Sequence, residues 1–310
     1  CIVQSQETVP ALHPLDGRVL WRRTDLPYDA GLVRDQATGM LADDVALVIF
    51  DSDLTTYRLL DPSSGEQLKA GVLEPSSEPR RRGWPFGRRL LYLTRTPEPR
   101  LRMWDPLCSE PVLDEPCGRR CLIDSGLGHG LAVILNGRRL SVLDTRSGER
   151  VWETELTEET ASATRQLRSF CESGRLCIHL EQDVPDSPTG QATHDIKYVP
   201  NVPLSGPLFV IDRHSGGHWS RRLPRCNLLL FPCERLPALI TVGRTREGRS
   251  RTDVGLVVEV IDIATGRTLA SRDDLARKTM MFLHASFDPE QQSVELRGRD
   301  THLSVRLESE

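Results

Sequence analysis

The histidines His214 and His218 have the residue type and the close spacing that could bind a metal ion. Histidine ligands that are near in sequence usually share one face of a helix or strand, whereas Gly216 and Gly217 place a turn between these two side chains. Such a turn directs the two imidazoles away from each other. We therefore expect solvated turn histidines and predict no metal site in this chain.

A glycine cluster, Gly126-Leu127-Gly128-His129-Gly130, is similar in composition to loops that bind phosphate groups. It lacks the G-x-G-x-x-G spacing of such loops, and the apolar segment that follows, residues 131–135, has strand length. We interpret the cluster as a loop before a strand. Nucleophilic catalysis has no support either, because the chain contains no G-x-S-x-G motif. We predict no catalytic and no cofactor-binding residues.

One basic and aromatic concentration could contact an acidic partner. The net charge of −4 provides no general attraction to nucleic acid, and two prolines in this segment, Pro79 and Pro85, favour an exposed loop leading into a strand at 90–94. We predict a solvated loop, with a patch for an acidic partner as the alternative, and no binding of nucleic acid. The residues concerned are Arg80, Arg81, Arg82, Trp84, Phe86, Arg88 and Arg89.

The cysteines are too sparse for a small disulfide-stabilised scaffold. Their spacings, with three residues between Cys117 and Cys121 and five between Cys171 and Cys177, differ from the paired C-x-x-C spacing of zinc sites. We predict buried or incidental thiols, with one or two disulfides as the alternative. The eight are Cys1, Cys108, Cys117, Cys121, Cys171, Cys177, Cys226 and Cys233.

The composition is that of a globular protein, with 38% hydrophobic and 27% charged residues in 310. The longest apolar runs, such as residues 45–50, have strand length, so we predict no membrane span. Because Cys1 leads directly into strand-like residues, we interpret the chain as the C-terminal part of a longer polypeptide.

A six-residue motif organises the chain: an apolar residue, Asp, two variable residues, Ser or Thr, and Gly. The Asp can accept hydrogen bonds from later backbone amides, and the Gly supplies the left-handed residue that closes a short hairpin. Each copy therefore predicts a β-hairpin. The motif occurs as Leu60-Asp61-Pro62-Ser63-Ser64-Gly65, Leu143-Asp144-Thr145-Arg146-Ser147-Gly148, Ile211-Asp212-Arg213-His214-Ser215-Gly216 and Ile261-Asp262-Ile263-Ala264-Thr265-Gly266, with degenerate copies at residues 12–17 and 104–109.

The flanks of the six turns share a second pattern. The positions two and four residues before the Asp position are apolar in every copy, as in a strand with one buried face, and so is the position three residues after the Gly. These last residues are Leu20, Leu68, Val112, Val151, Trp219 and Leu269.

The spacing of the turns indicates the size of the repeating unit. The Asp positions fall at 13, 61, 105, 144, 212 and 262, so the intervals are 48, 44, 39, 68 and 50 residues. Forty to fifty residues accommodate the four strands of a β-propeller blade. The longest interval contains residues 181–205, a proline-rich polar stretch that predicts an inserted surface loop. Residues 158–170 are the one helix candidate, and 279–287, 293–298 and 302–307 predict three final strands.

Residues 143–152, ending in Val151-Trp152, resemble the repeat of the pyrroloquinoline-quinone-like β-propellers, in which an Asp-x-x-Thr/Ser-Gly turn and a following Trp recur in each blade. Trp21 follows Gly17 at the same distance. The resemblance implies an all-β propeller of about seven four-stranded blades, possibly incomplete or closed by the terminal strands. It also implies that each Trp docks on the neighbouring blade, with Leu68, Val112 and Leu269 standing in where Trp is missing.

The functional expectation is a non-catalytic propeller, one domain over residues 1–310, that binds a protein partner or acts as a scaffold without a cofactor. The alternative is a quinoprotein dehydrogenase that uses the quinone and calcium, for which the chain lacks the adjacent cysteines of such alcohol dehydrogenases. The family resemblance favours an extracytoplasmic location in the bacterial envelope. The insertion at 181–205 is a candidate contact loop, with an unconstrained spacer as the alternative.

Overall fold

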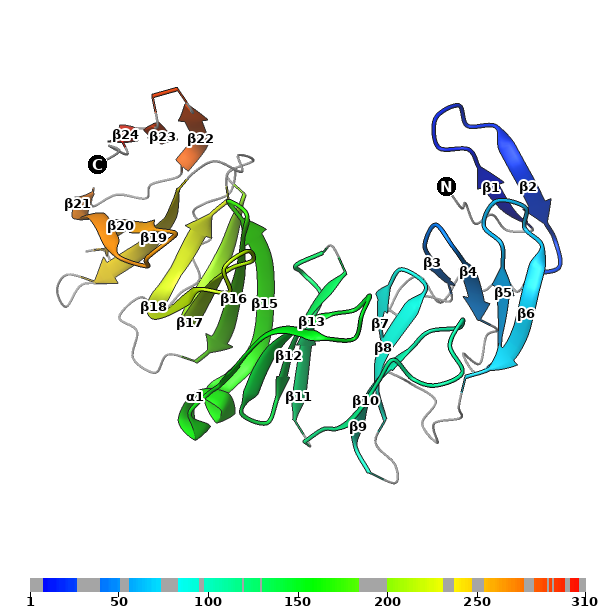
Figure 1. The fold of residues 1–310 in the computed structure, drawn as a ribbon. Helices are drawn as coiled ribbons and strands as arrows, with labels where there is room; N and C mark the ends of the chain where they lie inside the picture. The colour runs from blue at the N-terminus through cyan, green and yellow to red at the C-terminus, as the bar shows by residue number, and fades with distance from the viewer. Residues whose placement is uncertain are drawn as a thin grey trace. The chain divides into compact units, whose positions relative to one another are not determined.

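The computed structural model describes residues 8–26, 40–50, 56–73, 83–94, 98–118, 120–128, 130–183, 200–230, 237–246, 254–275, 282–288, 290–291, 293–298 and 302–306 (Figure 1). They fall into two compact units. Unit 1 comprises residues 1–121 and 129–153, and unit 2 comprises residues 122–128 and 154–310.

The chain is all-β, as predicted. The strands before the helix are β1 (Val9–Leu12), β2 (Val19–Arg23), β3 (Met40–Ala42), β4 (Leu47–Phe50), β5 (Thr56–Leu60), β6 (Gln67–Val72), β7 (Gly83–Phe86), β8 (Arg89–Thr94), β9 (Arg100–Trp104), β10 (Leu113–Pro116), β11 (Cys121–Asp124), β12 (Leu131–Asn136), β13 (Arg139–Asp144) and β14 (Arg150–Glu155). A short helix, α1 (Glu158–Ala163), is followed by β15 (Thr164–Glu172), β16 (Arg175–Gln182), β17 (Asn201–Asp212), β18 (His218–Leu229), β19 (Ala238–Arg246), β20 (Val254–Asp262), β21 (Thr268–Leu275), β22 (Phe282–Asp288), β23 (Ser293–Gly298) and β24 (His302–Arg306).

Four-stranded antiparallel sheets are the recurring unit, as in propeller blades. The described strands form three of them, in the orders β3-β4-β5-β6, β10-β9-β8-β7 and β11-β12-β13-β14. The pair β1-β2, a seven-stranded sheet from β15 to β21 and the sheet β22-β23-β24 complete the set. The three predicted C-terminal strands are confirmed.

The repeated turn is built as the motif predicts. Asp61 Oδ1 accepts hydrogen bonds from the amides of Ser63 and Ser64 at 2.7 and 2.9 Å, and the amide of Gly65 donates to the carbonyl of Asp61 at 2.8 Å. The motif glycines have φ between 69° and 81°, which is the left-handed region that glycine adopts without strain. The same bonds recur at Asp144, Asp212 and Asp262.

The buried face before each turn is also as predicted. The side chains two residues before the Asp position are at most 2% exposed, and those four residues before it at most 5%. They are Ala11, Leu59, Met103, Val142, Val210 and Val260, and Val9, Tyr57, Leu101, Leu140, Leu208 and Val258.

A side chain after one turn packs on the glycine of the next turn along the chain. In unit 1 the ring of Trp21 covers Gly65, where an added Cβ would lie 2.6 Å from Trp21 Cδ2, and its Nε1 donates to the carbonyl of Pro62 at 2.9 Å. In unit 2 Trp219 does the same on Gly266, and its Nε1 donates to the carbonyl of Ile263 at 2.9 Å. The docking implied by the family resemblance is therefore present at these two turns.

Of the three aliphatic side chains expected to replace Trp, only Val112 docks on the next turn, since a Cβ added to Gly148 would lie 2.8 Å from Val112 Cγ1. The expectation is wrong for Leu68 and Leu269, which are 53% and 54% exposed. Within the described residues, no atom lies within 4 Å of a Cβ added to Gly216, the motif glycine after Trp152. Each glycine that carries a docked side chain combines a left-handed φ with a neighbour that leaves no room for a side chain.

The predicted helix at 158–170 is largely wrong. Thr157 caps the first turn by accepting the amide of Thr160 at 3.2 Å, but α1 ends at Ala163 and the rest of the segment forms β15. Within β15 the side chain of Leu167 is buried and that of Phe170 half-buried, and pairing with β16 over eight register positions outweighs the local preference for helix.

The predicted loop boundaries at 181–205 are corrected at both ends. Residues 181–182 belong to β16 and residues 201–205 to β17, while 184–199 lie outside the described residues. The alternation of β17 buries Leu204, and Pro203 is tolerated because this half of β17 pairs with β18 and not with β16. A deletion confined to residues 184–199 would therefore remove no residue of either strand.

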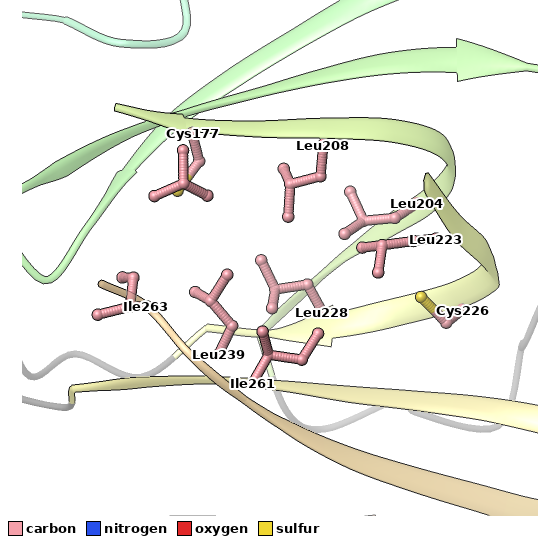
Figure 2. Close-up of a cluster of buried hydrophobic side chains, with 10 residues drawn as sticks. Cys177, Leu204, Leu208, Leu223, Cys226, Leu228, Leu239, Ile261 and Ile263 are labelled. Atoms are coloured by element: carbon pink, nitrogen blue, oxygen red, sulfur yellow. The ribbon is translucent and has the colours of Figure 1, made fainter. Parts of the chain in front are cut away.

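The seven-stranded sheet joins two repeat units through two long paired strands, β17 and β18. The first half of β18 pairs with the second half of β17, and the second half of β18 pairs on one side with the first half of β17 and on the other with β19. The described strands form six sheets, one of them with seven strands, which is compatible with the predicted number of about seven blades. The side chains of a common apolar core come from β16, β17, β18, β19 and β20, and Figure 2 shows among them Cys177, Leu208, Leu228, Leu239 and Ile261.

Candidate functional site

The sequence motifs that suggested a site are mostly parts of turns. His214 lies in the turn of Asp212, whose Oδ1 accepts its amide at 2.8 Å, and His218 begins β18. Gly126 and Gly128 lie in the connection from β11 to β12, as expected. Within the described ranges, no three His, Cys, Asp or Glu side chains are grouped as they would be to hold a metal ion.

The basic and aromatic concentration is not a solvated loop in its described part. Trp84 and Phe86 lie in β7, which pairs with β8, and Arg80 to Arg82 lie outside the described residues. Pro85 fits because β7 is an edge strand of its sheet. The prediction of a solvated loop is wrong here. The segment forms a β-hairpin, and the Arg88 and Arg89 side chains bind a carboxylate 16 or 17 residues later in the sequence instead of extending into solvent.

That carboxylate is Asp105, which has no exposed surface. It binds Arg88 Nε at 3.0 Å and Arg89 Nε at 2.6 Å, and its Oδ1 also accepts the amide of Leu107 at 3.0 Å. Arg88 contacts Asp43 at 2.9 Å, and Arg89 donates to the carbonyl of Thr145 at 2.6 Å. One buried carboxylate thus connects three segments of unit 1.

The pKa of Asp105 is lowered. Burial alone would raise it, but the hydrogen bonds from Arg88 and Arg89 outweigh the loss of solvation. The carboxylate is therefore ionised and fully engaged at neutral pH. Sequence reasoning assigned Asp105 only to a degenerate turn, and the unusual turn sequence that follows it was the one available sign of a different role.

The described cysteines are free thiols, as predicted, and Cys1 and Cys233 lie outside the described residues. Cys177 and Cys226 face the apolar core shown in Figure 2. Burial raises the pKa of Cys226 to about 12 and that of Cys177 further, so both remain protonated at neutral pH. Cys177 lies in β16, inside the apolar segment where the sequence placed it.

A buried carboxyl group, Glu172, lies where β15 meets the hairpin turn of Ser173 and Gly174. Its side chain is 7% exposed, and Oε1 has no hydrogen-bond partner among the described residues. Burial raises the pKa of Glu172 to about 7. Its cross-strand neighbour Arg175 is paired instead with Asp212, at 3.0 Å. Glu172 is therefore a group that changes charge near neutral pH.

Glu172→Gln is expected to stabilise the protein at alkaline pH. The folded pKa, about 7, lies above the reference value of 4.5, so the stability associated with neutral Glu172 is complete below pH 4.5 and is lost as the pH rises through 7. The 2.5-unit difference corresponds to about 3 kcal/mol at pH 8. Urea unfolding at pH 4.5 and pH 8 should show a gain for the variant, relative to wild type, only at pH 8. The exposed Glu153→Gln is the control, and an equal gain at both pH values would contradict the assignment.

A second buried polar group, His179, lies at the centre of β16 with no exposed surface. Its Nε2 accepts the amide of Ser205 at 2.8 Å, while Ser205 Oγ donates to the carbonyl of Gln182 at 2.9 Å. Burial lowers the pKa of His179 to about 4. The sequence interpretation missed both Glu172 and His179, although a histidine inside the apolar run at 176–180 was a usable sign.

A recurrent exposed apolar position lies three residues after the motif glycine. Four side chains at this position are between 39% and 54% exposed, each on an edge strand: Leu20 on β2, Leu68 on β6, Val151 on β14 and Leu269 on β21. Val72, on the same strand as Leu68, is 64% exposed. The repeat thus places an aliphatic side chain in solvent at a fixed position, where a polar residue would be expected on folding grounds alone.

Comparison with known proteins gives little sequence similarity. No family model and no curated protein matches the chain. Among solved structures it is similar to BamB from Moraxella catarrhalis, with 12% identity, 98% of this chain and 89% of that chain covered, and a TM-score of 0.35. It is also similar to Hsv2p from Kluyveromyces lactis (9% identity, 86% and 74% covered, TM-score 0.32) and to the dihydro-heme d1 dehydrogenase NirN in complex with DHE (12%, 95% and 58%, TM-score 0.37).

Proposed function

We propose that this chain is a non-catalytic β-propeller that binds a protein partner through the exposed apolar residues of its edge strands. The observation that carries the proposal is the recurrence of an exposed aliphatic side chain at the same motif position in four copies of the repeat. Exposed aliphatic residues that occur singly need no explanation, but their recurrence at one position of a repeat favours a contact surface.

The chemistry of the turns supports a scaffold. The side-chain oxygens of the motif aspartates accept hydrogen bonds from the amides of their own turns, and Asp212 also forms an ion pair with Arg175. The most buried of them, Asp105, is engaged by two arginines. These carboxylates hold the hairpins together, which is a structural role.

Site-specific photocrosslinking tests the proposed surface. A photoreactive amino acid at position 68 or 151 should give the same crosslinked partner when the purified chain is mixed with an extract of the source cells. Positions 67 and 69 on β6 are matched controls, because both side chains are exposed and polar and lie on the opposite face of the strand from Leu68. Leu68→Glu should remove the product formed at position 151 if one partner covers both strands. Equal crosslinking at the control positions would refute the proposed surface.

The competing enzymatic function is tested on the same preparation. Oxidation of alcohols or sugars that requires both the quinone and calcium would replace the binding proposal with a quinoprotein dehydrogenase. The oxidation is followed by reduction of an electron-accepting dye. If the binding proposal is right, adding the quinone and calcium should not raise dye reduction above that of the chain alone.

An extracytoplasmic location is the compartment that we propose. None of the helices within the described residues is both long enough and apolar enough to span a membrane. Fractionation of cells that express the protein tests the proposal, and recovery in the cytosolic fraction alone would overturn it.

A further inference from the structure

The point where β17 separates from β16 is held by two hydrogen bonds from Ser205, one of them to the buried imidazole of His179. β16 pairs with β17 only between residues 175–179 and 208–212, and the register of β17 shifts between Leu204 and Gly206. At this shift Gly206 has φ 119°, and an added Cβ would lie 2.5 Å from the carbonyl oxygen of Leu180. Two hydrogen bonds then connect Ser205 to β16, one to His179 Nε2 and one to the carbonyl of Gln182.

The bond to His179 requires a neutral ring. An amide can only donate, so Nε2 must be an acceptor, and the ring proton must lie on Nδ1. Nδ1 is buried and has no hydrogen-bond partner among the described residues. Protonation would place a donor against the Ser205 amide and a charge in a site with no exposed surface.

We propose that His179 is an acid-operated latch: its protonation breaks the bond to Ser205 and frees the N-terminal half of β17 while the rest of the sheet stays paired. After the latch opens, residues 201–204 are held by their pairing with residues 226–229 of β18. Opening these residues also withdraws Leu204, which is 1% exposed, from the core and breaks the bond from Ser205 to Gln182, while β18 keeps its pairing with β19.

The charged neighbours of His179 have opposing effects on its pKa. Across the sheet it faces Arg168 of β15 and Leu208 of β17, and beyond Leu208 lies Arg221 of β18, which is paired with Glu259 of β20 at 2.6 Å. Arg168 is paired with Glu181 of β16 at 2.9 Å, and these two charges shift the His179 pKa in opposite directions. Burial is the main cause that lowers this pKa, to about 4.

Hydrogen exchange measured on the full chain tests the latch. After correction for intrinsic exchange rates, protection of the amides at 201–206 should fall roughly fiftyfold between pH 7 and pH 4.5, as expected when a histidine with a pKa of about 4 becomes solvated. Residues 256–262 of β20 should keep their protection. His179→Gln, whose amide oxygen can accept the Ser205 amide without titrating, should abolish the acid response, and His218→Gln should retain it.

Two results would overturn the proposal. One is an acid response at 201–206 that is the same in His179→Gln as in wild type, and the other is simultaneous loss of protection in β20, which would indicate global unfolding. If His179→Gln does not fold, nitrogen NMR of the wild-type imidazoles at pH 7 decides. The proposal requires one ring that is neutral with its proton on Nδ1 down to about pH 5, and its absence would refute the latch.

Discussion

Replacing Asp105 by alanine is expected to lower the free energy of unfolding by about 3–5 kcal/mol, since two arginine side chains lose a buried carboxylate. Asp105 has no exposed surface and binds Arg88 and Arg89 at 3.0 and 2.6 Å. Among the described residues, Arg88 retains Asp43 as its ionic partner, and Arg89 keeps backbone carbonyl acceptors including Thr145. Chemical denaturation at pH 7 measures the loss.

The matched control for this prediction is Asp61→Ala. Asp61 has the same position in its repeat, but its side chain accepts hydrogen bonds from the turn and is partly exposed, so a clearly smaller loss is expected. Changing Arg88 and Arg89 to methionine in the Asp105→Ala background should recover part of the stability, because the unpaired charges are then removed. Equal losses for Asp105→Ala and Asp61→Ala would show that the ion cluster is unimportant.

The second large effect is expected for Gly266→Ala, which combines two costs. Alanine at φ 72° costs about 1 kcal/mol, and its Cβ would lie 2.7 Å from Trp219 Cδ2, which adds about 1–3 kcal/mol of overpacking. The ring cannot easily retreat, because its Nε1 is bound to the carbonyl of Ile263. We expect a total loss of about 2–4 kcal/mol in thermal or urea unfolding.

Gly216→Ala separates the two costs. Gly216 has φ 69° and no atom within 4 Å of an added Cβ, so it should lose only the conformational part, about 1 kcal/mol. In a Trp219→Ala background, which itself lowers stability, the additional loss from Gly266→Ala should fall to the Gly216 value. If Gly266→Ala costs no more than Gly216→Ala in the wild-type background, the Trp does not dock on this turn in solution.

The sequence alone determined the repeating unit and its buried face. The turn at Asp61 could be predicted because its bonds run within a few residues, from Asp61 to Ser63, Ser64 and Gly65. Burial of positions such as Leu59 and Tyr57 followed from the two-residue period of a strand, which needs no knowledge of the partner strand. The predicted docking of Trp21 on a neighbouring repeat came from the family resemblance.

Tertiary structure alone decided the properties that depend on residues distant in the chain. The sequence predicted that Arg88 lies in a solvated loop, whereas the fold brings Asp105 beside it. Residues 164–170 form a strand because they pair with β16. The charge states of Glu172 and His179 depend on how much solvent their neighbours exclude, which no local pattern specifies. The hydrogen bonds of a turn depend on residues adjacent in the sequence, whereas burial and ion pairing arise only when separate strands come together.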